Sequence, residues 1–167
     1  RSIAEYLSAR YLAQRISDGL STARVAALMV GADGGVITSL RGLNAWLATC
    51  STVARSRLVE IDPIGVLLYG DVKAFSKNEK IQLLRAISHS IEKNTARRNE
   101  DWNSFAFSAL VTPDMAEEFV RILRNPSRER ADQTAADIVI TALSQSPKLV
   151  GLETTLLEVA KDKTRWA

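Results

Sequence analysis

The chain has one cysteine and one histidine among its 167 residues, so it is short of the residue types that many catalytic and metal sites require. Cys50 alone cannot form an intrachain disulfide or a multi-cysteine zinc site, and we expect it to be a packed side chain in a cytoplasmic protein. His89 has Arg85 and Lys93 at its i±4 positions, where a carboxylate partner would be needed. The sequence therefore predicts no catalytic residue, no metal site and no cofactor.

Glycine and proline are also scarce, with eight and four residues, which leaves too little turn chemistry for a many-stranded β-sandwich or barrel. No apolar run approaches the roughly 18 residues that a membrane span needs, and no signal peptide opens the chain. The one glycine-rich loop, 31–35, is followed by Val36 and Ile37 instead of the Lys and Ser or Thr of a Walker A loop. We interpret it as a turn with positive φ values, followed by a short extended segment.

Basic and acidic residues nearly balance: 22 Lys and Arg stand against 19 Asp and Glu, with a net charge of +3. A mixed, solvated surface is the favoured interpretation. The strongest basic cluster surrounds a predicted turn and consists of Arg121, Arg124, Arg128 and Arg130. Glu117 and Glu118 are placed to pair with Arg121 on one helix face. A nucleic-acid-binding surface built on this cluster is the competing hypothesis.

The most informative stretch is 40–71, whose apolar residues are spaced for about three short helices. Asp62 can act as an N-cap with Pro63 at the first helical position, so one helix ends near Glu60 and another begins at once. Four polar or amphipathic residues interrupt this apolar block and form either an internal network or a contact surface for another domain: Arg41, Trp46, Tyr69 and Asp71. The internal network is the favoured interpretation.

Capping and periodicity predict further helices along the chain. A capping box at Ser2 opens a helix that reaches Asp18 and is apolar over so much of its circumference that we expect cover on two sides. Ser21 is the expected N-cap of a second helix, which runs to Gly31. The capping box at 76–79 opens another helix, to about residue 94, whose polar side is expected to carry Lys80, Gln82, Arg85, Ser88 and Glu92.

The C-terminal part contains a pattern close to a repeat. The pairs Thr112-Pro113 and Ser146-Pro147 both read as helix starts, and 146 − 112 gives a spacing of 34 positions. A helix with Met115, Phe119, Ile122 and Leu123 inward, a break at 125–127 and a helix with Ala135, Ile138, Val139 and Ala142 inward lie between them, and a final helix follows. We therefore predict an all-α superhelix of HEAT-like stacked hairpins with about 8–10 helices. It is expected to be a single helical domain, 1–167, with a flexible joint at 94–101.

Three segments resemble the helical region that follows the ATPase module in bacterial NACHT and related STAND proteins. They are 1–12 (RSIAEYLSARYL), 40–48 (LRGLNAWLA) and 62–71 (DPIGVLLYGD), with Ser8 where the family more often has Ala. The chain opens on Arg1 rather than Met, which is expected of a fragment of a longer protein.

The resemblance implies a piece of a large signalling or antiviral NTPase whose Walker motifs lie upstream, and it carries over no catalytic residue. Such a piece would relay nucleotide state or sense a ligand through contacts with neighbouring domains and other proteins. We expect this fragment to be a non-catalytic interaction module with no membrane partner.

Overall fold

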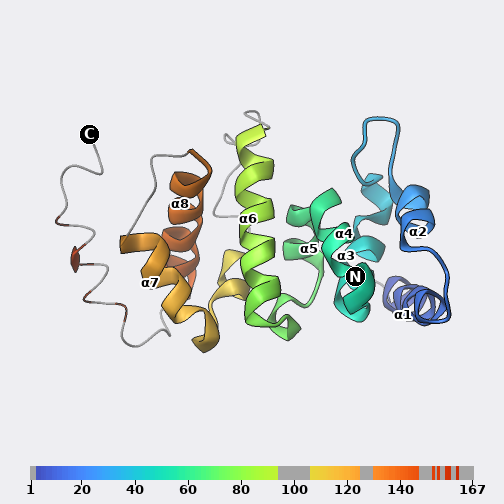
Figure 1. Ribbon diagram of the computed structural model, residues 1–167, viewed down its shortest axis with the longest axis horizontal. Coiled ribbons are helices and arrows are strands. Elements are labelled where there is room, and N and C mark those ends of the chain that lie inside the picture. Colours follow the sequence, from blue (N-terminus) through green and yellow to red (C-terminus); the bar gives the residue numbers. More distant parts are fainter. Residues whose placement is uncertain are drawn as a thin grey trace. The chain divides into compact units, whose positions relative to one another are not determined.

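The computed structural model describes residues 3–93, 106–124 and 130–146, together with positions 152, 154, 157, 158 and 161. Over these residues the secondary structure comprises eight α-helices and several short 3₁₀ turns (Figure 1). Extended pairing in the described residues amounts to a single antiparallel bridge between Val30 and Val36. The predicted all-α fold class is confirmed.

The chain divides into two compact units, Arg1–Ile87 and Ser88–Ala167. The boundary falls within helix α6 (Lys77–Lys93), so this helix contributes to both units. The flexible joint expected at 94–101 lies outside the described residues and stays a prediction.

The first unit is organised around helix α3. In chain order, its elements are α1 (Ile3–Ser17), α2 (Thr22–Met29), η1 (Thr38–Leu40), α3 (Arg41–Cys50), α4 (Thr52–Ile61), α5 (Pro63–Tyr69), η2 (Val72–Ala74) and the first part of α6. Helix α3 packs against α1, α4 and α5, and its Ala45, Leu47 and Ala48 are fully buried. The three short helices predicted in 40–71 are therefore present as α3, α4 and α5, and α3 packs on both of the others as well as on α1.

The second unit contains the end of α6, η5 (Phe107–Leu110), η6 (Pro113–Met115), α7 (Ala116–Arg124) and α8 (Arg130–Gln145). Helix α8 packs against η5 and α7. The predicted inward residues of these helices are buried, apart from the half-buried Ile122: Met115, Phe119, Leu123, Ala135, Ile138, Val139 and Ala142. The break at 125–127, Pro147 and most of the final helix lie outside the described residues, so the repeat spacing stays a prediction.

Several predicted helix starts differ in detail from the structure. Thr112-Pro113 opens the 3₁₀ turn η6, and the α-helix begins only at Ala116. Ser21 precedes α2, but its side chain accepts no capping hydrogen bond. The segment after the glycine loop is extended only around Val36, because Thr38–Leu40 forms the 3₁₀ turn η1. In the predicted turn, Gly34 has the positive φ, at 80°.

The expected polar side of α6 was wrong at two positions, because Lys80 and Ser88 are 3% and 2% exposed. Lys80 precedes Leu84 by four residues and Ile87 by seven, and so lies on the same helical stripe as these buried side chains. At this exposure the ammonium group of Lys80 is withdrawn from water together with its aliphatic stem, and it takes part in a polar interaction there, as a buried charge requires. On this helix, the position of a residue in the 3.6-residue period therefore decides whether its side chain is buried, even when that side chain is polar or charged.

Candidate functional site

The first polar centre joins α3 to α5 through Arg41 and Asp62. Nε of Arg41 lies 2.7 Å from Oδ2 of Asp62, and Nη2 lies 2.9 Å from Oδ1, which is a two-pronged ion pair. The backbone N–H of Gly65 donates to Oδ1 of the same carboxylate at 2.9 Å. Asp62 therefore caps α5, as predicted, and at the same time holds the first residue of α3.

Two aromatic contacts involve residues of α3, and one of them is made by Arg41 itself. The guanidinium of Arg41 lies 5.5 Å from the ring centre of Tyr69, the last residue of α5. Trp46 meets Tyr6 of α1 edge to face, with ring centres 5.2 Å apart. Asp71 is exposed, and its backbone N–H donates to Oγ1 of Thr49 at 3.1 Å. The carboxylate that pairs with Arg41 is thus Asp62, and the sequence analysis had assigned Asp62 to capping alone.

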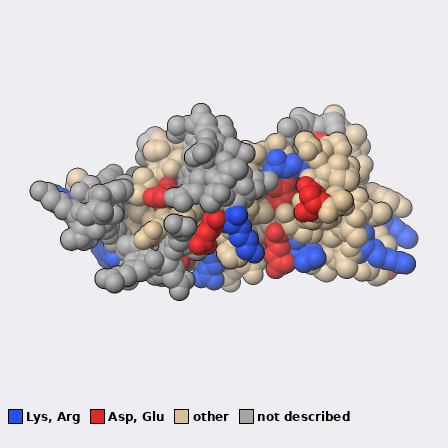
Figure 2. Space-filling model, turned by 90° about the horizontal axis from the view of Figure 1, so that it is seen from above, with Lys and Arg blue, Asp and Glu red and all other residues tan. Residues whose placement is uncertain are grey.

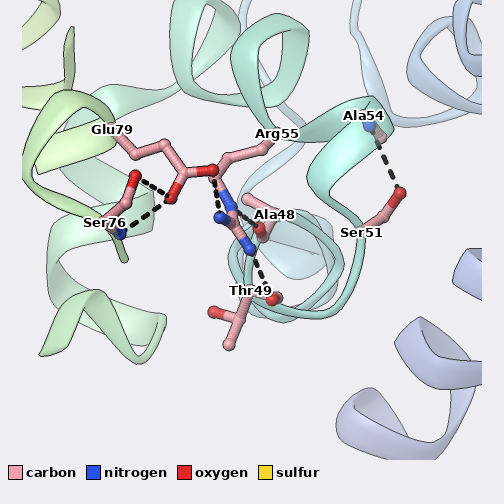
Figure 3. Close-up of polar contacts among 7 residues, drawn as sticks. All are labelled: Ala48, Thr49, Ser51, Ala54, Arg55, Ser76 and Glu79. Atoms are coloured by element: carbon pink, nitrogen blue, oxygen red, sulfur yellow. Dashed lines mark hydrogen bonds and ion pairs between the residues drawn. The ribbon is translucent and has the colours of Figure 1, made fainter. Parts of the chain in front are cut away.

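The second polar centre is built on Arg55 of α4, which is 7% exposed (Figure 3). Its Nε donates to the carbonyl oxygen of Ala48 at 2.7 Å, and its Nη2 donates to that of Thr49 at 3.0 Å. These carbonyls belong to the last turn of α3, where a cation is favoured by the helix dipole. Arg55 therefore caps the C-terminal end of α3.

The remaining contacts of Arg55 reach the start of α6. Nη1 pairs with Oε1 of Glu79, and the guanidinium carbon lies 4.4 Å from the ring centre of Phe75. Oε2 of Glu79 accepts hydrogen bonds from the backbone N–H of Ser76 at 2.8 Å and from its hydroxyl at 2.7 Å. Burial acts to raise the pKa of Glu79, but the bonds from Ser76 and Arg55 outweigh it and lower the pKa below its usual value.

Arg55 is not among the residues predicted from the sequence, although its spacing on the helix marks it. Arg55 stands three residues before Leu58 and four before Val59, both of which are buried, so it lies on the apolar stripe of α4. Arg57, two residues later on the same helix, is exposed and pairs with Glu60 at 3.5 Å. Helical position therefore distinguishes Arg55, which lies on the buried side of α4, from Arg57, which lies on its exposed side.

The two arginines of the basic cluster whose side chains are described, Arg121 and Arg124, both lie beside carboxylates. Arg121 bonds to both carboxylate oxygens of Glu118, at 2.9 and 2.6 Å, and this pairing raises the pKa of Arg121. Nη2 of Arg124 lies 3.5 Å from Oε2 of Glu158. Arg128 and the side chain of Arg130 lie outside the described residues. The face in Figure 2 likewise shows basic and acidic side chains interspersed.

The reactive side chains do not gather into a site in the part of the chain that is described. Cys50 is half-buried, and burial raises the pKa of its thiol, which disfavours the reactive thiolate. His89 is exposed, with Nδ1 3.9 Å from Oε2 of Glu92. Among the described residues, no three His, Cys, Asp or Glu side chains are grouped to hold a metal ion. The described helices are also too short or too polar to cross a membrane.

Comparison of the chain with protein-family models, with curated proteins and with solved structures gave no match. Of the predicted interface residues, Arg41, Trp46 and Tyr69 make side-chain contacts between helices of the first unit.

The Asp62 carboxylate both caps α5 and pairs with Arg41, and it lies where a side chain on Gly65 would be. A methyl group at position 65 should therefore disturb both contacts. A Cβ on Gly65 would lie 2.6 Å from Cγ of Asp62, well inside contact distance. Alanine for glycine within a helix ordinarily stabilises by about 1 kcal/mol. We expect Gly65→Ala instead to lower the free energy of unfolding by about 1–3 kcal/mol, because the cap and the ion pair are displaced.

Chemical denaturation followed by circular dichroism measures this change. The matched control is Gly65→Ala in an Asp62→Ala background, where the methyl group meets no carboxylate and should be neutral or stabilising. A stabilising effect of Gly65→Ala in the otherwise unchanged chain would show that the carboxylate position is not fixed.

The lowered pKa of Glu79 predicts a pH dependence of stability. A carboxylate whose pKa is lower in the folded than in the unfolded chain stabilises the fold above the unfolded pKa, which has an ordinary value of 4.5. The contribution is lost as the pH falls through the folded pKa. We therefore expect stability to fall more steeply between about pH 5 and pH 3 in the unaltered chain than in Glu79→Gln.

Thermal unfolding across this pH range provides the measurement. Glu60→Gln is the control, because Glu60 is exposed and makes only a surface pair with Arg57, and it should preserve the steep decline. Parallel curves for Glu79→Gln and the unaltered chain would contradict the assignment of this titration to Glu79.

Proposed function

We propose that the chain is a non-catalytic helical scaffold and interaction module of a larger STAND-type signalling or antiviral NTPase. It relays nucleotide state, or senses a ligand, through contacts with neighbouring domains and other proteins. One observation carries the proposal: the buried Arg55 of the first unit donates to the carbonyls of Ala48 and Thr49 at the end of α3 and pairs with Glu79 of α6, so its charge is used to join helices. The resemblance of segments 1–12, 40–48 and 62–71 supplies the class of parent protein.

The two polar centres suit a module that transmits displacement. Asp62 fastens α5 to α3, and Arg55 fastens α3 and α6 to α4. Helices joined at their ends by desolvated charged bonds resist independent movement, because separating one partner leaves a buried charge unpaired. A change in position at one helix is then passed to the next, as a relay between domains requires.

The packing order supports a HEAT-like architecture for this module. Most helices pack on the next helix or the next but one along the chain: α3 packs on α1, α4 and α5, and α7 packs on α8. Such a succession of local contacts is what an α-solenoid needs, since each hairpin buries its apolar side against the next one. The proposed superhelix would continue this local packing from one hairpin to the next.

The proposal predicts no nucleotide binding by this chain. Calorimetric titration with ATP or ADP, each with Mg²⁺, should give only heats of dilution, because the Walker motifs are expected upstream of Arg1. A saturable isotherm would contradict the proposal, as would a parent gene without a Walker A and B pair upstream.

A mobility-shift titration with double-stranded DNA and single-stranded RNA at low salt tests the competing function. We expect unchanged mobility, because Arg121 and Arg124 are paired with Glu118 and Glu158. A shift with a steep salt dependence would instead favour the nucleic-acid-binding domain.

A further inference from the structure

Helix α1 presents an apolar stripe to solvent. Ile3, Leu7 and Tyr11 are 77%, 56% and 66% exposed, and their spacing of four residues places them in one row along the helix. Ala9 and Ile16 are buried on the opposite side. The expectation that α1 is covered on two sides is therefore wrong for the described structure, which covers one side and leaves this stripe exposed.

Both edges of the stripe carry positive charge. Arg10 and Arg15 are exposed, and at about 100° per residue they lie about 60° to one side of Leu7 and about 80° to the other. The one acidic residue of α1, Glu5, is directed to α3 instead, where a Cβ on Gly42 would lie 2.7 Å from its Cδ. The exposed side of α1 thus combines three apolar side chains with two cations, and the nearest carboxylate, Asp18, follows the helix and accepts a hydrogen bond from Nε2 of Gln14 at 3.0 Å.

We propose that this surface, which we call the α1 stripe (Ile3, Leu7, Tyr11, Arg10 and Arg15), docks an amphipathic helix of a partner protein whose apolar face is bordered by Asp or Glu. The inference rests on the proposed function, because it names the partner class of the interaction module. From Ile3 to Tyr11 the stripe rises about 12 Å, which is enough for two turns of a partner helix to lie against it. Acidic borders on that helix complement Arg10 and Arg15.

Charge also decides against a second copy of α1 as the occupant. Two such stripes in contact would bring Arg10 and Arg15 of both copies together across the interface, and the one nearby carboxylate of each copy, Asp18, already accepts a hydrogen bond from its own Gln14. Like charges held close together are repulsive and disfavour the wrong partner. An acidic helix from a different protein has the opposite sign at the same positions.

The test uses two fluorescein-labelled helical peptides of about 18 residues that share one leucine stripe and differ only in Glu or Lys at its borders. Fluorescence anisotropy at low salt should show the Glu peptide binding about tenfold more tightly than the Lys peptide. The double variant Arg10→Glu/Arg15→Glu should reverse this preference. Leu7→Glu should weaken binding of the Glu peptide by about tenfold or more.

The matched control is Leu28→Glu, which places the same charge on another exposed leucine, 76% exposed on α2, and should leave binding unchanged. Circular dichroism of each variant confirms that the helices persist. Equal affinity for both peptides, or equal losses in Leu7→Glu and Leu28→Glu, would overturn the proposal.

Two further measurements identify the other occupants. A dimer in analytical ultracentrifugation that Leu7→Glu dissociates would assign the stripe to a second copy and overturn the proposal. Binding to vesicles of anionic lipid without binding to the Glu peptide would assign it to a membrane surface, with the same consequence. The two proposals fail on different results. If neither peptide binds and ATP does not bind either, only the docking proposal for the α1 stripe is contradicted. If ATP binds, the proposed function is contradicted.

Discussion

The first unit depends on two arginines, each paired with polar groups at one end of α3. Arg41 stands at the first turn of α3 and is bonded to the carboxylate that caps α5, while Arg55 from α4 bonds to the carbonyls of the last turn of α3. A guanidinium withdrawn from water must be paired, and removing one partner is costly. These bonds therefore fix where α3 begins and ends relative to its neighbours, in addition to the apolar packing along its length.

The break between α4 and α5 lies at the same carboxylate. A single residue, Asp62, separates Ile61 from Pro63; its φ of −144° and ψ of 73° interrupt the helix, and its side chain caps α5. Gly65 is needed beside it, because the carboxylate occupies the space that a Cβ would take. The short helices of 41–69 are thus held by one shared acidic group as well as by their buried leucines and valines.

The sequence predicts the helices well because capping and periodicity are local. Asp62-Pro63, the capping box at Ser76 and the buried face of α8 are all recognisable within a few residues. The pairing of Arg41 with Asp62 joins residues 21 positions apart, and that of Arg55 with Glu79 joins residues 24 apart, so local patterns do not specify them. Lys80 and Arg55 were recoverable from helical spacing, but their charge suggested a solvated position. The exposed side of α1 was missed for the converse reason, since apolar residues suggested burial.

The proposed relay requires that α3, α4 and α5 behave as one body, held by the contacts of Arg41, Asp62 and Arg55. Native-state hydrogen exchange tests this requirement most directly, because it gives the free energy of opening for each amide. The account predicts that the slowest amides of the three helices share one opening free energy. Exchange from α5 through an opening clearly less costly than that of α3 would contradict it.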